Sequence, residues 1–284
     1  MYIILRGAAA AFRRNEMRKW LALLLACLLV LTLAACGDKK TDEDEEFNLD
    51  PTVDDEYVAV GGDYHDEYTY EAINGNEAMI TGFQSDYAPH AVVVPAVIAE
   101  RPVTAIAESA FYQKSAITSL TIPDGVTTIG KLAFAGCSQL TSVTLPASVT
   151  SIGEGAFAEC TALTTLTLPA GLDTVSSKLC YNCTALTTVA LSASATAIGT
   201  QAFMNCEALT TVTGGAAVTE IDTHAFFACR TLSAFPFAGM TELTSIGASA
   251  FANCAALARP ALDASVEVGE NAFYVAPAAD EPAA

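Results

Sequence analysis

Cysteine recurs at a fixed interval of 23 residues through the middle of this 284-residue chain. The series runs through Cys137, Cys160, Cys183, Cys206 and Cys229, and Cys254 follows 25 residues later. Phenylalanine keeps the same spacing, at Phe111, Phe134, Phe157, Phe203, Phe226, Phe251 and Phe273. Self-similarity at such a period is typical of a solenoid, in which short coils stack along one axis. We therefore predict a solenoid of about seven to eight coils over residues 96–275, with these phenylalanine and cysteine side chains in its core.

The unit that begins at Leu140 indicates how one coil is built. Apolar residues alternate with hydroxyl residues from Leu140 to Leu145, which predicts a short strand that Pro146 ends. A coil of 23 residues buries too little apolar surface to offset the conformational entropy that it loses. Successive coils must therefore stabilise one another by packing and by parallel strand pairing.

Hydroxyl residues lie between the apolar positions of these strands in successive coils, which predicts a continuous polar face. Threonine suits exposed strand positions, so this face is either scaffold or a recognition surface. Regular Thr-x-Thr arrays also resemble those of ice-binding solenoids. The candidate binding face comprises Thr118, Ser119, Thr121, Thr141, Ser142, Thr144, Thr164, Thr165, Thr167, Thr187, Thr188, Thr210, Thr211 and Thr213.

The cysteines admit three interpretations: disulfides, a redox or zinc site, or buried packing thiols. Equivalent side chains of stacked coils lie about 4.8 Å apart, more than the Cβ separation of about 3.8 Å in a disulfide. Cys180 and Cys183 form a lone C-x-x-C, but Cys183 belongs to the series and Cys180 occupies a phenylalanine position. We expect buried, reduced thiols.

The first residues predict export. Arg18 and Lys19 precede an apolar run, Trp20–Leu33, which at 14 residues is shorter than the roughly 20 that a spanning helix needs. Residues 1–35 are therefore interpreted as a signal peptide, and Met17 is an alternative start.

The run Leu33-Ala34-Ala35-Cys36 resembles a bacterial lipobox, after which the cysteine is lipidated and becomes the first residue of the mature protein. The resemblance implies an extracytoplasmic protein held on the bacterial cell membrane by a lipid on Cys36. An ordinary signal peptide with a chance cysteine is the alternative.

Composition divides the rest of the chain. Residues 36–56 are rich in Asp and Glu, which predicts an acidic, disordered tether rather than a calcium site. Residues 57–95 contain two strand patterns around Asn74 and Gly75, which predicts a hairpin that caps the solenoid. Residues 276–284 are expected to be a disordered tail.

The net charge of −19 disfavours nucleic acid as a partner, because such a surface repels phosphate. The three histidines lie near no recurring acid and nucleophile, so we expect no enzyme, no cofactor and no metal. Gly125–Lys131 matches the start of a phosphate-binding loop, but Leu132 stands where Ser or Thr is needed, and the match follows from the repeat itself.

The repeat resembles the leucine-rich repeats of BspA-type bacterial surface proteins. The resemblance rests on Leu140–Pro146, Val149–Gly153 and Ala156–Cys160 and their equivalents, over roughly residues 68–275. It implies a curved solenoid with parallel strands, displayed outside the cell. It also implies adhesion or interaction with an extracellular protein or glycan; a structural envelope protein without a specific ligand is the alternative.

Overall fold

The computed structural model describes residues 67–83 and 90–276. The contacts divide the chain into Met1–Ala59 and Val60–Ala284, and all described residues belong to the second unit. The predicted signal peptide, Cys36, the tether 36–56, the beginning of the cap and residues 277–284 of the tail lie outside the described residues.

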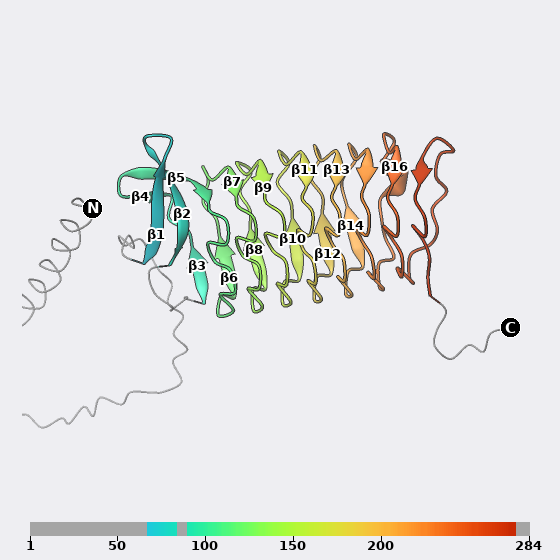
Figure 1. The fold of residues 1–284 in the computed structure, drawn as a ribbon, viewed down its shortest axis with the longest axis horizontal. Coiled ribbons are helices and arrows are strands. Elements are labelled where there is room, and N and C mark those ends of the chain that lie inside the picture. Colours follow the sequence, from blue (N-terminus) through green and yellow to red (C-terminus); the bar gives the residue numbers. More distant parts are fainter. Residues whose placement is uncertain (1–66, 84–89, 277–284) are drawn as a thin grey trace, which may run out of the picture. The chain divides into compact units, whose positions relative to one another are not determined.

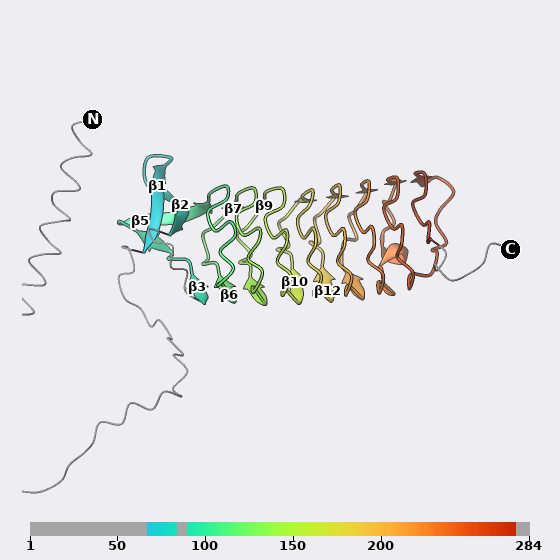
Figure 2. The ribbon, with the colours of Figure 1, turned by 60° about the horizontal axis from the view of Figure 1, so that its bottom comes forward.

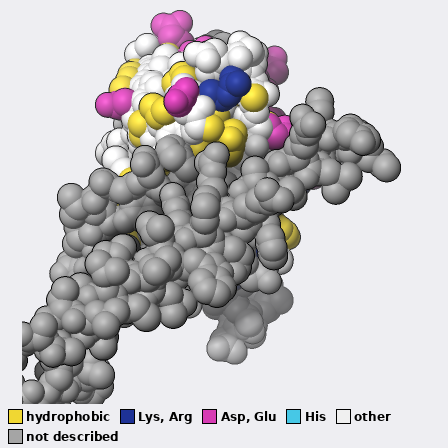
Figure 3. All heavy atoms as spheres, turned by 90° about the vertical axis from the view of Figure 1, so that its left-hand side faces the viewer, with side chains coloured by type: hydrophobic (Ala, Val, Ile, Leu, Met, Phe, Trp, Pro, Cys, Tyr) yellow, Lys and Arg dark blue, Asp and Glu magenta, His cyan; other side chains and the backbone are white. Residues whose placement is uncertain are grey.

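The predicted N-terminal hairpin is present. Strand β1 (Tyr68–Ile73) pairs antiparallel with β2 (Glu77–Phe83), and Asn74 and Gly75 take positive φ angles of 47° and 79° in the turn between them. β2 then pairs parallel with β5 (Arg101–Ile106), to which β4 (Val97–Ile98) adds antiparallel. The hairpin thus continues one sheet of the solenoid (Figure 1). Figure 3 shows hydrophobic, acidic and basic side chains interspersed on the visible part of this end.

The coils form the predicted solenoid of parallel strands (Figures 1 and 2). Most coils supply one strand to each of two stacks, which run along the axis, and the last two coils supply a strand to the second stack only. The first stack contains β3 (Ala91–Val93), β6 (Ser119–Thr121), β8 (Ser142–Thr144), β10 (Thr165–Thr167), β12 (Thr188–Ala190) and β14 (Thr211–Thr213). The second contains β7 (Thr128–Ile129), β9 (Ser151–Ile152), β11 (Thr174–Val175), β13 (Ala197–Ile198), β15 (Glu220–Ile221), β16 (Ser245–Ile246) and β17 (Glu267–Val268). No α-helix occurs among the described residues, which contain one short 3-10 turn at Phe237–Gly239.

A column of aromatic rings runs through the core. Phe111, Phe134 and Phe157 stack with centroids 5.1 and 5.5 Å apart. A second run stacks at 5.1 to 5.3 Å, through Phe203, Phe226, Phe251 and Phe273. Phe273 ends the column and is only half-buried, whereas the other six rings are at most 1% exposed.

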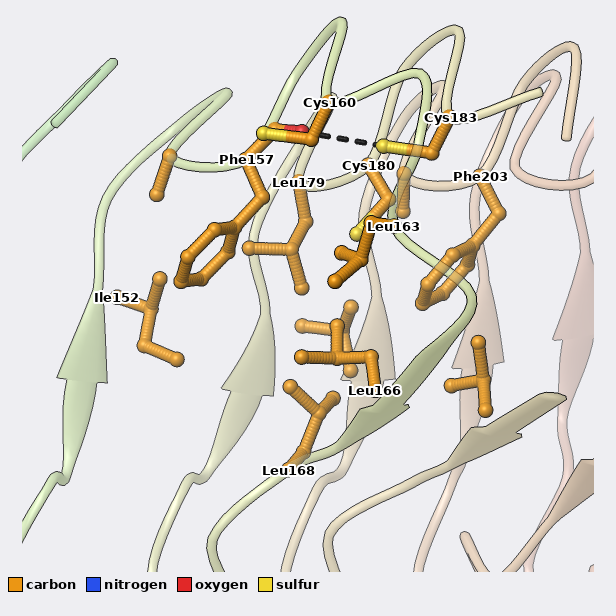
Figure 4. Packing of buried hydrophobic residues seen from close by; sticks show 14 of the residues in the cluster. Ile152, Phe157, Cys160, Leu163, Leu166, Leu168, Leu179, Cys180, Cys183 and Phe203 are labelled. Carbon is orange, nitrogen blue, oxygen red and sulfur yellow. Dashed lines mark hydrogen bonds between the residues drawn. The ribbon is translucent and has the colours of Figure 1, made fainter. Parts of the chain in front are cut away.

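Leu179 and Cys180 interrupt this column, and both are fully buried. They stand where the other coils carry Ala and Phe, and Figure 4 shows them between Phe157 and Phe203. The leucine therefore supplies apolar volume that the missing ring would have given. At the N-terminal end, Phe83 and Tyr68 extend the column, with the Phe83 ring 5.0 Å from that of Phe111.

Each of the six fully buried phenylalanines of the column lies in a turn with two left-handed residues, two positions before it and two after it. Around Phe157 these are Gly155 (φ 63°) and Glu159 (φ 60°), and around Phe203 they are Gln201 (φ 58°) and Asn205 (φ 61°). A non-glycine residue in this conformation costs on the order of 1–2 kcal/mol. Hydrogen bonds between coils hold it, since the Glu159 N–H donates to the Tyr181 carbonyl at 2.7 Å.

The first stack weakens at the 25-residue coil. Only a single bridge, Thr211 to Ala234, continues the pairing after β14, and the 3-10 turn follows. Phe235 and Phe237 fill this coil, with rings 4.9 and 5.2 Å from Phe251. The additional residues therefore extend the aromatic core at the expense of the strand.

Candidate binding face

The first stack of strands places hydroxyl residues in two outward columns. Ser119 pairs with Ser142 and Thr121 with Thr144, and the same register joins Thr165 to Thr188 and Thr211 farther along. The residue between the two outward ones in each strand points inward, as Leu166 (2% exposed) does between Thr165 and Thr167. We call the outward residues the threonine face: Ser119, Thr121, Ser142, Thr144, Thr165, Thr167, Thr188, Ala190, Thr211 and Thr213.

Five of the predicted binding residues make a different contact. The Thr141 hydroxyl donates to the Thr118 carbonyl at 3.0 Å, and the Thr164 hydroxyl donates to the Thr141 carbonyl at 3.3 Å. Thr187 and Thr210 continue this series at 2.9 and 3.1 Å, and Thr118 begins it at the His90 carbonyl. These five hydroxyls tie each coil to the preceding one, so they lie beside the threonine face and stabilise it.

The hydroxyls of the threonine face are free to meet a ligand. Among the described residues, Thr211 alone in this set has a side-chain hydrogen bond, to Thr210 at 3.4 Å. Most of the set is exposed, and no charged residue belongs to it. Each hydroxyl offers one donor and two acceptor lone pairs. The face is therefore an uncharged array of hydrogen-bonding groups on a rigid sheet.

The cysteine side chains lie inside the solenoid, in an environment that does not favour reactive thiolates. All seven described cysteines are buried and free. Six donate from Sγ to a carbonyl 26 or 28 residues earlier, as Cys183 does to Phe157 at 3.1 Å (Figure 4). Burial raises the pKa of Cys137 to about 12, and it raises the pKa values of Cys160 and Cys180 well above the ordinary value. Thiols held in the protonated form are poor nucleophiles and poor metal ligands.

Charged groups form local pairs. Glu154 accepts from Lys131 at 3.0 Å and from Lys178 at 3.2 Å, and these hydrogen bonds hold its pKa below the ordinary value. Lys131 ends the segment Gly125–Lys131, which matches the start of a phosphate-binding loop in sequence but contains strand β7 in the structure.

In residues 67–83 and 90–276, no group of three or more His, Cys, Asp or Glu could hold a metal ion. No helix in these same ranges is long and apolar enough to cross a membrane.

A second surface feature was not predicted from the sequence. A shallow groove of about 590 Å³ runs along the turns that follow the phenylalanine column. Its lining residues are Gln113, Gly136, Ser138, Glu159, Thr161, Asn182, Thr184, Asn205 and Glu207. Polar residues that recur at 23-residue spacing in the turns are the signal of this groove in the sequence.

Comparison with known proteins agrees with the repeat. A family model described as the BspA type leucine-rich repeat region matches residues 104–233 and 217–278. The crystal structure of a leucine-rich repeat protein of T. pallidum has 28% identity and a TM-score of 0.62, covering 67% of this chain and 88% of that one. A leucine-rich repeat protein from Bacteroides ovatus shares the fold, with 24% identity, a TM-score of 0.56 and coverage of 74% and 61%. Comparison with curated proteins gives no match.

Proposed function

This chain belongs to the BspA-type leucine-rich repeat family, and from that premise we propose that it is a bacterial surface protein whose threonine face binds an extracellular partner. The observation that carries the proposal is the register between β6 and β8 and along β10, β12 and β14. It aligns hydroxyls that, apart from that of Thr211, make no side-chain hydrogen bond within the described residues. The role is one of binding, without catalysis.

The rigidity of the sheet supports this proposal. Hydrogen bonds from Thr141, Thr164 and their equivalents fix each strand against the next, so little conformational freedom is lost when a ligand binds. Preorganised hydrogen-bonding groups raise affinity because their ordering cost is met on folding. The partner class is a protein or a glycan that offers neutral polar groups.

Surface display depends on the N-terminal region. We propose that lipid on Cys36 holds the protein on the cell membrane and that residues 36–56 space the solenoid from the lipid surface. The support is the apolar run followed by Leu33-Ala34-Ala35-Cys36.

Capture of a partner tests the proposal. The chain from residue 37 onward is immobilised and incubated separately with host-matrix proteins, bacterial surface proteins and a glycan array. A specific partner supports the binding role. Failure with all three, together with an even distribution of the protein over the cell envelope, would instead favour a structural envelope protein.

A further inference from the structure

The groove on the turns is a second surface, separate from the threonine face. None of its lining residues belongs to a strand. It spans five successive coils, from that of Gln113 to that of Asn205. At about 4.8 Å for each coil step, its length is about 19 Å. Its volume of about 590 Å³ falls in the range of ligand sites.

Backbone geometry fixes one side of this groove. Gln113, Gly136, Glu159, Asn182 and Asn205 all have positive φ, between 57° and 75°. Their N–H groups donate to carbonyls of the next coil at 2.7 to 2.9 Å. Equivalent atoms in successive coils are therefore held at one regular spacing.

The second side of the groove consists of Ser138, Thr161, Thr184 and Glu207. Thr161 donates its hydroxyl to the Ser138 carbonyl at 3.2 Å, which ties two coils together. Thr184 is exposed, and its hydroxyl has no side-chain hydrogen bond within the described part of the chain. The two sides thus present amide, hydroxyl and carboxylate groups along the axis.

The lining chemistry limits the ligand. Asn205 donates through Nδ2 to Asn182 Oδ1 at 2.8 Å, which orients both amides and leaves an NH₂ group on Asn182 and a carbonyl oxygen on Asn205 for a ligand. Glu159 and Glu207 are acidic and no basic residue lines the groove, although Arg230 lies 3.9 Å from Glu207 beyond its end, so the lining disfavours an anionic ligand. Tyr112, next to Gln113 and accepting its hydrogen bond at 3.2 Å, is 46% exposed and offers an aromatic ring beside one end.

The spacing of the coils distinguishes two kinds of extended ligand. A peptide strand rises about 3.3 Å per residue, so like-facing side chains repeat at about 6.6 Å and fall out of step with coils about 4.8 Å apart. A pyranose ring in an extended β-1,4-linked glycan advances by nearly the same length as one coil. We infer that the groove binds a neutral linear glycan, with about one sugar ring per coil.

This site is independent of the threonine face, and the test keeps the two apart. The full mature chain is titrated calorimetrically with cellohexaose, chitohexaose and xylohexaose, and with hexagalacturonate as the acidic comparison. Thr184→Arg places a long side chain in mid-groove. The coil accommodates it, because Arg230 occupies the equivalent position two coils later. Thr174→Arg is the matched control: this exposed residue of β11 lies outside both the groove and the threonine face.

At least one neutral hexasaccharide should bind, with its trisaccharide much weaker and hexagalacturonate unbound. Thr184→Arg should lower the affinity by about tenfold or more through lost hydrogen bonds and blocked space, while Thr174→Arg should leave it unchanged. Absence of binding by all three neutral probes would overturn the inference. So would equal binding by folded Thr184→Arg, or loss of binding in Thr174→Arg alone. A partner captured through the threonine face should bind Thr184→Arg normally, so the failure of one site leaves the other testable.

Discussion

Replacing Phe157 with alanine tests the core most sharply. The ring is fully buried, and it stacks on Phe134 at 5.5 Å. Its other neighbour along the column is the coil of Leu179 and Cys180, which already lacks a ring. Phe157→Ala would leave two consecutive coils without one, so the cavity has no aromatic group on that side to relax into it. We expect a loss of about 3–5 kcal/mol in the free energy of unfolding.

The coil of Leu179 and Cys180 indicates a second substitution that should offset part of the stability lost in Phe157→Ala. Ala156 and Phe157 correspond to Leu179 and Cys180 one coil later. The double variant Ala156→Leu with Phe157→Cys introduces the same Leu-Cys pair into the neighbouring coil and fills part of the cavity with apolar side-chain volume. It should therefore be more stable than Phe157→Ala by about 1–3 kcal/mol.

Urea unfolding followed by far-ultraviolet circular dichroism measures both effects. Phe273→Ala is the control at the end of the column, where a half-buried ring should contribute only about 1–2 kcal/mol. Because each coil is stabilised by its neighbours, the loss at residue 157 should lower the unfolding midpoint of the stack. Equal midpoints for Phe157→Ala and the wild type would refute the assignment of this ring to the core.

Three further predictions concern the cysteines and the N-terminus. Native thiols should react slowly with a maleimide and all seven described ones should react after unfolding, since they are buried; rapid native labelling would contradict their burial. Stability should fall at alkaline pH, because burial raises the folded-state pKa of thiols such as Cys137 and Cys206. The contribution of these thiols to the free energy of unfolding is complete below the unfolded-state pKa of about 8.5 and is lost as the pH rises through the folded-state pKa. Between the two pKa values the loss is about 1.4 kcal/mol per pH unit for each thiol. A urea midpoint that is flat from pH 8 to 10.5 would refute this. Cys36→Ser should move the protein from the membrane to the soluble fraction, and a mutant that stays with the membrane beside an unlabelled wild type would exclude lipid anchoring.

The repeat period made the fold predictable because stacking forces residues at equal phase into equal environments. Phe111 and Phe134 are buried for the same reason, and so are Cys137 and Cys160. The hairpin was predictable because Asn74 and Gly75 take the positive φ angles that its turn requires.

Side-chain hydrogen bonds were not predictable at this level. Thr164 and Thr165 are adjacent and chemically identical, yet one bonds to the preceding coil and the other faces outward. That difference depends on the three-dimensional position of each residue, since Thr165 lies in β10 and Thr164 directly precedes it. The groove was missed for a related reason: Glu159 and Asn182 adopt left-handed conformations that are more typical of glycine, and pairing between coils imposes them.

The dissociation constant of the captured partner tests the central claim most directly. Thr144→Lys with Thr167→Lys places two charges on the threonine face, at positions that are exposed and lack side-chain hydrogen bonds in the described part of the chain. Ser151→Lys with Thr174→Lys makes the matched change on the second stack, where both residues are also exposed. The account predicts that the first pair weakens binding by about tenfold or more and that the second leaves it unchanged. Equal dissociation constants for the wild type and the folded Thr144/Thr167 variant would contradict it.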